Sequence, residues 1–441
     1  MDNQLEFARS VVEMAHSCGA SEAEAACSIS DRFSVEARAQ VITKLEQSTG
    51  KTLHLRVFVD GRKATLATSD FEPSHLQAAI AQLIAGARHV AKDAYNVLPE
   101  PVAVDEAELE LYSSELAARD PQVKIDEVRT LERRIREIDE RIQNSNGSHV
   151  GDSITNVSLA NSRGFSGEYR ATRASRGSSP VATDGSDKRT GSYGTAARKL
   201  SEMESIDGVA QTAVKRTVEL FGARKPPTMR VPVIFERDVA ASVLSDLFAA
   251  LSAGNIAIGN SWLTDRLGDQ IGSSLATIID DGRMVGALGS APFDGEGVPT
   301  QRTTIFEAGK LRSFLFDTYY ARKLGAVSTG NSTGGGVGPN NFYLKAGSQS
   351  ARDLIASTKR GVFVVDTIGF ATEHASGTYS RGARGFCIQN GELAYPIDEF
   401  TIASTFGDML AGMDGVANDL RFDGAVVSPT FRVAEMTISG G

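Results

Sequence analysis

Turn dipeptides between apolar runs limit the possible folds of this chain more than any other feature. They suit the tight hairpins that join antiparallel strands, whereas parallel strands need long crossover connections. The alternating stretch Thr52–Val59 leads into such a turn. The dipeptides are Asp60-Gly61, Asp281-Gly282, Ala308-Gly309 and Asn390-Gly391. The sequence therefore predicts an α+β fold with a largely antiparallel, β-rich second half.

Five segments carry the apolar spacing of amphipathic helices. Asp2 and Asp120 can cap the free amides at two helix starts, and Pro121 suits a first turn because its missing N–H would be unpaired there. The predicted helices are Asp2–His16, Ser74–Ala91, a helix from Asp120 through Ile142, Ile206–Phe221 and Asp238–Ser252.

Proline-rich segments predict the domain limits. A chain of 441 residues is too long for one ordinary core, so two or three domains are expected. Pro226-Pro227 precedes the apolar strand Val231–Phe235 and suggests domains at 1–225 and 226–441. Leu98–Pro101 marks a further boundary region near 98–120 within the first domain. The polar stretch Ala182–Ser192 is the segment we expect to be the most mobile.

Composition disfavours several classes of protein. The formal net charge of −9 argues against sequence-independent nucleic-acid binding, which needs a basic face. No run of roughly 18 apolar residues occurs, and Met1–Gln4 lacks the pattern of a signal peptide, so we expect a cytoplasmic protein without a membrane contact. Cys18, Cys27 and Cys387 have unrelated spacings and are predicted to be buried free thiols.

Several blocks of the second half follow a distinctive order. Phe293–Val298 reads FDGEGV, and Thr329–Asn331 reads TGN. More specific are Gly377–Ala383, which reads GTYSRGA, then Asn390–Glu392 and Thr401–Ala403. In order and spacing these blocks resemble the TldD/PmbA metallopeptidase family, on its TldE (PmbA) side. The resemblance implies a peptidase system in which TldD-type and TldE-type subunits pair and act on extended peptides or unfolded proteins.

The resemblance also locates a metal position that this chain does not fill. In TldD-type chains a helix carries an HExxxH motif that binds zinc, and a later cysteine completes the ligands. The motif's histidines and glutamate fall approximately at Leu244, Ala249 and Ser245, none of which is a plausible zinc ligand. The region near Asp423 likewise has no cysteine. We therefore expect no catalytic residue and no cofactor in this chain, and zinc in a TldD-type partner.

Candidate substrate-cleft or interface residues come from two of the matching blocks. They are Gly330, Asn331, Tyr379, Ser380 and Arg381. The glycine-rich stretch 330–338 could line a cleft, connect two elements or, as a weaker hypothesis, cradle a phosphate. It lacks the Gly-Lys-Ser/Thr ending of a P-loop and a helical pattern after it.

Two other kinds of site are weaker hypotheses. Glu373-His374 is the one adjacent acid and imidazole in the second half, but no second histidine or cysteine lies at ligand spacing. Residues 330–334 spell GxSxG around Ser332, without the helix that a nucleophile elbow needs. Ser380 is a further conceivable nucleophile, for which packing at a subunit interface is the preferred interpretation.

Three functional hypotheses follow. The leading one is a non-catalytic TldE-type subunit that forms a heterodimer with a zinc-bearing TldD-type chain and helps to enclose extended peptides. The second is a homodimeric peptide- or protein-binding member of the family, favoured by departures such as Ser404–Phe406, which stands where the family usually has Gly-Asn-Leu. The third is an independent hydrolase with a reshaped site.

Overall fold

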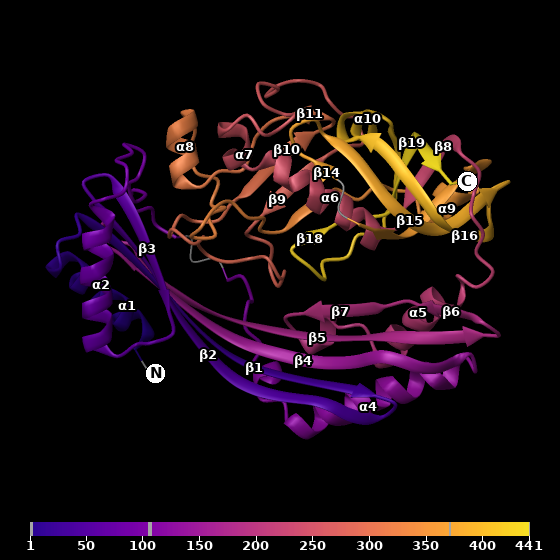
Figure 1. Cartoon of the computed structure of the whole chain (residues 1–441), viewed down its shortest axis with the longest axis horizontal. Coiled ribbons are helices and arrows are strands. Elements are labelled where there is room, and N and C mark those ends of the chain that lie inside the picture. Colours follow the sequence, from indigo (N-terminus) through magenta and orange to yellow (C-terminus); the bar gives the residue numbers. More distant parts are fainter. Residues whose placement is uncertain (1–2, 105–107, 370–371, 441) are drawn as a thin grey trace.

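A long curved sheet forms the first half of the chain (Figure 1). In this computed structural model, residues 3–104, 108–369 and 372–440 are described. The strand order is β3-β2-β1-β4-β5-β6, with β7 also paired to β5, and every pairing is antiparallel. The strands are β1 (Glu22–Arg38), β2 (Val41–Val59), β3 (Arg62–Thr68), β4 (Ile142–Asn161), β5 (Ser166–Asp184), β6 (Asp187–Thr190) and β7 (Tyr193–Ala197).

Helices pack on this sheet through the apolar stripes that the sequence predicts. One core joins two of them to the strands through Val11, Leu55 and Ile80, and a second core joins two others through Ile135 and Val214. The elements are α1 (Gln4–Ser17), α2 (Pro73–Ala87), α3 (Ser114–Ala117), α4 (Pro121–Ile138), α5 (Ile206–Val218) and the 3₁₀ turn η1 (Leu200–Glu202).

Helix ends show where the sequence prediction needs correction. Asp120 does cap α4 through the amide of Gln122. The helix stops at Ile138, however, because the backbone is already extended at Asp139. Ile142 begins β4, and its side chain is buried in the same core as Ile135 of the helix. Asn3 caps α1 through the amide of Glu6, whereas the cap proposed at Asp2 lies outside the described residues.

The second half contains a closed ring of strands. The main path is β13-β8-β19-β16-β15, and β13 also pairs with β15, which closes the ring. Only the β13–β8 pairing in this ring is parallel. The strands of this sheet are β8 (Met229–Phe235), β13 (Arg360–Ile368), β14 (Thr372–Glu373), β15 (Thr378–Gln389), β16 (Glu392–Thr405), β17 (Met413–Val416) and β19 (Phe431–Ser439).

A smaller sheet and five helices complete the second half. The order of this sheet is β11-β10-β9-β12-β18. Its strands are β9 (Ile278–Asp281), β10 (Arg302–Glu307), β11 (Lys310–Leu311), β12 (Phe342–Leu344) and β18 (Val426–Val427). The helices are α6 (Arg237–Leu251), α7 (Ala253–Ala257), α8 (Thr318–Leu324), α9 (Ala351–Ala356) and α10 (Phe406–Ala411).

The predicted hairpins were right at two of the three positions in this half. Ala308-Gly309 joins β10 to β11, and Asn390-Gly391 joins β15 to β16, with positive φ at all four residues. Asp281-Gly282 is not a hairpin turn, because β9 ends there and its partner β10 begins only at Arg302. The α+β class with a largely antiparallel second half is confirmed.

The largest core lies between the two sheets of the second half, around α6. Leu244 and Leu247 of this helix are buried there, together with Phe235 and Phe431, whose rings lie 5.1 Å apart. The proposed limit at 225/226 falls between α5 and β8, and the boundary region near 98–120 lies between α2 and α4. Since β1 pairs with β4 across that second region, one sheet spans both sides of it. No helix within the described ranges is long and apolar enough to cross a membrane.

Buried arginines join the long sheet to the second half. Arg56 of β2 donates to Glu24 of β1 at 2.7 Å and to Glu296 of the second half at 2.7 Å. Arg198, which is 6% exposed, donates to the carbonyl oxygens of Ala287, Leu288 and Ser290. These contacts cross between the halves and orient one against the other.

The Arg56 cluster carries a buried carboxyl that can accept a proton. Burial raises the pKa of Glu24 to about 7, against the attraction of Arg56. Its Oε1 accepts from Arg56, while its Oε2 has no hydrogen-bond partner among the described residues and can hold the proton. Between its ordinary pKa of 4.5 and about 7, the folded chain therefore binds more protons at Glu24 than the unfolded chain does.

This difference predicts the pH dependence of stability. Because the folded state holds the extra proton, the contribution of Glu24 to the free energy of unfolding falls as pH rises from 4.5 to about 7. Glu24→Gln keeps an acceptor for Arg56 and should flatten that part of the curve, measured by urea unfolding at several pH values from 5 to 7.5. Glu13→Gln, on the exposed side of α1, is the matched control. Equal slopes for wild type and Glu24→Gln would contradict this assignment.

Candidate functional site

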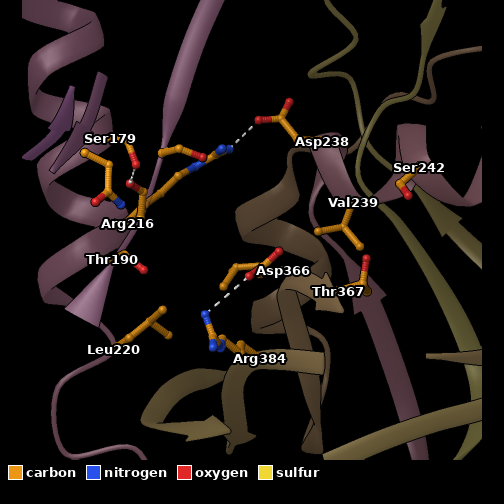
Figure 2. A pocket seen from close by; sticks show the side chains of 14 residues that line it. Ser179, Thr190, Arg216, Leu220, Asp238, Val239, Ser242, Asp366, Thr367 and Arg384 are labelled. Atoms are coloured by element: carbon orange, nitrogen blue, oxygen red, sulfur yellow. Dashed lines mark hydrogen bonds and ion pairs between the residues drawn. The ribbon is translucent and has the colours of Figure 1, made fainter. Parts of the chain in front are cut away.

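A cleft between the long sheet and the second half is the candidate site (Figure 2). Two adjoining cavities of about 440 and 450 Å³ share Arg216, Leu220 and Val365 in their linings. We call them the first and second cavities. α5 and the segment after β6 contribute one wall, and the start of α6 with β13 and β15 contributes the other.

Ion pairs across the first cavity join its two walls. Arg216 of α5 contacts Asp238 at 2.6 Å and Glu236 at 2.9 Å, at the start of α6. Figure 2 shows Arg216 reaching across the cavity toward Asp238. Although burial opposes its charge, Glu236 and Asp238 raise the pKa of Arg216. Burial, and then the neighbouring Asp238, raise the pKa of the Glu236 carboxyl.

A strand edge faces the first cavity. β13 pairs with β8 only at Val362–Val364, because β8 ends at Phe235 and the chain turns into α6. Beyond Val364, the described pairings of β13 are with β15 on its other side. Val365 forms a bulge there, and Val365, Asp366 and Thr367 line the cavity. Backbone groups on this edge can pair with an added extended chain.

The second cavity combines charged groups with aromatic side chains. The hydroxyl of Tyr193 donates to Glu204 at 2.7 Å and accepts from Arg237 at 2.9 Å and from Arg421 at 2.5 Å. Phe363 and Phe386 lie in its wall. Together the two cavities are lined by nearly equal numbers of basic and acidic side chains, namely Lys215, Arg216, Arg237, Arg384 and Arg421, and Glu204, Glu219, Glu236, Asp238, Asp366 and Asp419.

The β5–β6 hairpin closes one side of the first cavity. Asp184 pairs with Asp187 around a turn at Gly185, and Thr190 lines the cavity. Arg189 reaches Asp398 of the second half at 2.9 Å. Asp398 also accepts from Arg384 at 3.2 Å, and Arg384 lies 3.7 Å from Asp366. The segment Ala182–Ser192, predicted to be mobile, is thus a hairpin held by an ion-pair chain.

Gly330 and Asn331 lie in a buried polar network. Asn331 donates to Asp280 at 2.7 Å and to the carbonyl oxygen of Gly338. Gly330 has φ of 68° and approaches Pro299 so closely that an added Cβ would lie 2.5 Å from its carbonyl oxygen. Neither residue contributes to the first or second cavity. Their contacts hold the loop, and a role in substrate binding stays a prediction.

The tip of the glycine-rich loop lines a separate cavity of about 300 Å³. Gly334, Gly335 and Gly336 face Arg56 and Tyr319 across it, between the first sheet and α8. The amide of Ser332 donates to Asp294 and that of Gly334 donates to the Ser332 hydroxyl, so these two amides are already occupied. The geometry matches a cleft-lining loop better than a phosphate cradle. No histidine or lysine in the described ranges makes a hydrogen bond to the Ser332 hydroxyl.

Tyr379, Ser380 and Arg381 lie together on β15, whereas Gly330 and Asn331 lie on the loop between α8 and β12. Tyr379 is 1% exposed, and its ring packs against Phe235 and Phe406 at centroid distances of 6.4 and 5.6 Å. Burial raises its pKa. Arg381 forms an ion pair with Asp246 of α6 and donates to the carbonyl oxygen of Gly369. The half-buried Ser380 pairs with Ala403.

A departure from the family pattern has a local structural role. Thr405 caps α10 by accepting from the amide of Asp408 at 3.1 Å, and Phe406 packs on Tyr379. The sequence Ser404–Phe406 is therefore explained by the start of this helix. It adds no support to a separate binding function.

The α6 positions where the resemblance places the HExxxH motif do not carry side chains that fit a zinc ion. Leu244 is 2% exposed and lies in the large core, and Ala249 is partly buried. Both have only hydrocarbon side chains, and Ser245 is exposed. Asp423, near the position of the ligand cysteine, is paired with Arg421. These side chains lack the imidazole and thiolate donors that such a zinc site uses.

His374 lies beside Trp262. The backbone amide of Trp262 donates a hydrogen bond to the carbonyl oxygen of His374 at 2.9 Å. Within the described residues, no group of three or more His, Cys, Asp or Glu side chains is arranged to hold a metal ion.

The residues that line the first and second cavities were not among the candidates predicted from the sequence. Arg216, Asp238 and Arg384 come from separate elements, and only the folded chain brings them together. One signal was present, since Glu236 and Asp238 stand at a predicted helix start, where carboxylates are favoured.

Comparisons with known proteins agree along the whole chain. Residues 228–440 match the PmbA/TldA metallopeptidase C-terminal domain, 114–221 the central domain and 23–91 domain 1. The metalloprotease PmbA homolog of Haemophilus influenzae is 33% identical, with 97% of this chain and 94% of that protein covered. The metalloprotease PmbA of Escherichia coli O157:H7 is 30% identical, with 99% and 98% covered.

Solved structures share the fold over nearly the full length. A candidate modulator of DNA gyrase from Bacteroides thetaiotaomicron superposes with a TM-score of 0.93 at 25% identity, covering 100% of both chains. TldE from Thermococcus kodakarensis gives a TM-score of 0.90 at 23% identity, covering 98% of this chain and 100% of that one.

The Arg189–Asp398 contact predicts how firmly the β5–β6 hairpin is held. Arg189→Gln should increase trypsin cleavage at the exposed Lys188 by roughly 3- to 10-fold, because a partly buried ion pair no longer opposes local opening. High salt should raise the wild-type rate in the same direction. Arg133→Gln on α4, where the side chain is 54% exposed, is the matched control. Unchanged cleavage in Arg189→Gln would show that the ion pair does not restrain the hairpin.

Proposed function

The chain belongs to the PmbA/TldD metallopeptidase family, on its PmbA (TldE) side, and on that premise we propose that it is a non-catalytic subunit. It pairs with a zinc-bearing TldD-type chain in the cytoplasm and completes the cleft in which peptides or unfolded proteins are hydrolysed. The relatives named metalloproteases support the proteolytic setting.

The observation that carries this proposal is the chemistry of α6. Leu244 and Ala249 offer only hydrocarbon where the resemblance places zinc-binding histidines, and Ser245 offers no general base. Hydrolysis by a zinc-bound water needs both a metal and a base to accept its proton. On this proposal both belong to the partner, and the contribution of this chain is to bind and orient the substrate.

The interdomain cleft supports an extended peptide as the ligand. Main-chain hydrogen bonds to the edge of β13 at Val365–Thr367 would add the peptide as a strand. Such binding depends little on which side chains the peptide carries. The near balance of charge in the lining also suits a main chain with mixed side chains better than a strongly charged ligand.

A homodimer that binds peptides without hydrolysing them is the alternative. It shares the cleft and the fold, and differs in the partner. Copurification with a TldD-type chain favours the heterodimer, whereas a stable homodimer that gives no hydrolysis on mixing favours the alternative.

A mixing experiment tests the leading proposal. Purified alone, the chain should bind no stoichiometric zinc and cleave no unstructured peptide, because α6 carries no ligand set. Adding a TldD-type chain from the same source should give peptide cleavage well above that of either chain alone. Removing zinc with a chelator should abolish it. Metal content is measured by mass spectrometry and cleavage by chromatography. Chelator-sensitive cleavage by this chain alone would contradict the proposal.

Filling the first cavity should separate binding from assembly. Ser242 lies on α6 in the lining, and Ser242→Trp would occupy space that a peptide needs. We expect the activity of the mixed subunits to fall by at least about tenfold, with copurification retained, because an obstructed cleft removes substrate positioning. Ser10→Trp on an exposed position of α1 is the matched control. Full activity in Ser242→Trp would exclude the first cavity as the substrate path.

A further inference from the structure

Arg237 is a cation of the second cavity that retains unused donors. It is the first residue of α6, and its side chain is 22% exposed. Its Nη2 donates to the Tyr193 hydroxyl at 2.9 Å, and its Nε lies 3.4 Å from Asp238. Asp238 is itself contacted by Arg216 at 2.6 Å. Since a guanidinium has five N–H donors, Arg237 can bind a further acceptor.

Several other charged groups around Arg237 have closer partners. Arg421 contacts Glu204 at 2.6 Å and also pairs with Asp423. Asp419 accepts from the amide and the hydroxyl of Thr430, both at 2.8 Å. Glu204, Glu236, Asp238 and Asp419 therefore have close partners, whereas the guanidinium groups of Arg237 and Arg216 keep unused donors. This asymmetry favours an anion over an amine as the added ligand.

The two cavities connect the peptide path with Arg237. Val365 lies at the free edge of β13 and lines both cavities. A strand added to that edge in the first cavity can therefore continue toward the second. Phe363 and Phe386 offer it an apolar wall there. The second cavity, at about 450 Å³, has room for the end of a chain and not for a folded protein.

From these contacts we infer that the second cavity binds the carboxy-terminal carboxylate of the peptide, with Arg237 as the main donor and the Tyr193–Arg421 pair fixing its position. This inference rests on the proposed function and adds to it the direction of the bound peptide, whose carboxyl end would lie toward Arg237. Burial raises the pKa of Glu219 and contributes with Asp238 to raising that of Glu236, which weakens the negative potential opposing a carboxylate.

The test compares one peptide sequence with two different groups at its carboxyl terminus. The probe is a fluorescein-labelled pentapeptide of alternating alanine and leucine, made as the free acid and as the carboxamide. Binding to the full chain is followed by fluorescence anisotropy. The free acid should bind about tenfold more tightly than the amide, as expected for one charge-assisted hydrogen-bonded contact. An amide peptide ending in glutamate distinguishes a side-chain carboxylate from the terminal one, and should bind like the plain amide.

Variants assign the effect to Arg237. Arg237→Gln should reduce the affinity for the free acid to that for the amide, and Arg237→Lys should restore part of the difference. Arg133→Gln should behave as wild type. Equal binding of acid and amide to the wild type would overturn this inference and leave the proposed function standing. If neither peptide binds, this inference is also overturned, and the mixing experiment decides the proposed function separately. If the glutamate-ended amide matches the free acid, recognition of the terminal carboxylate is overturned.

Discussion

Arginine side chains help to hold the long sheet against the second half, and one of them, Arg216, joins the two walls of the cleft. Arg56 binds carboxylates from both halves, and Arg198 binds three carbonyl oxygens of the second half. Arg216 and Arg189 reach acidic groups on α6 and β16. Removing such ions from water costs several kcal/mol each unless partners replace the lost hydration. A polar contact surface of this kind contributes less to stability than to geometry, because each guanidinium accepts only partners at fixed directions.

The nature of that contact surface explains the cleft. An apolar seam would close by packing side chains together, whereas paired charges leave gaps where their directions diverge. The first and second cavities lie on either side of Arg216, where its pairing with Glu236 and Asp238 bridges the two walls. Because acidic and basic side chains pair across the walls, the lining has little net charge. A ligand there is selected by its main chain and by a few unsaturated donors, of which Arg237 is the clearest.

Local patterns predicted much of the fold, and long-range pairing explains what they missed. The stripe of α2, the cap at Asp120 and the turn at Asn390-Gly391 depend on neighbours within a few residues, so the sequence shows them directly. Asp281-Gly282 has the same local chemistry, but β9 pairs with strands far along the chain, which no dipeptide specifies. Arg216 and Asp238 were likewise invisible as a pair, because 22 positions of sequence separate partners that only tertiary folding joins.

The resemblance places the first metal ligand of α6 at Leu244, and this position is part of the core. Leu244 packs with Leu247 and Phe235 in the largest cluster of the chain. Replacing it with histidine would remove buried hydrocarbon and introduce a polar ring without its own partner, a change that costs on the order of 2 kcal/mol or more. Asp423, beside the missing cysteine, is engaged by Arg421, which also supports Tyr193 in the second cavity. Leu244 thus belongs to the core and Asp423 binds an arginine of the second cavity, so zinc ligands placed at these two positions would disturb both.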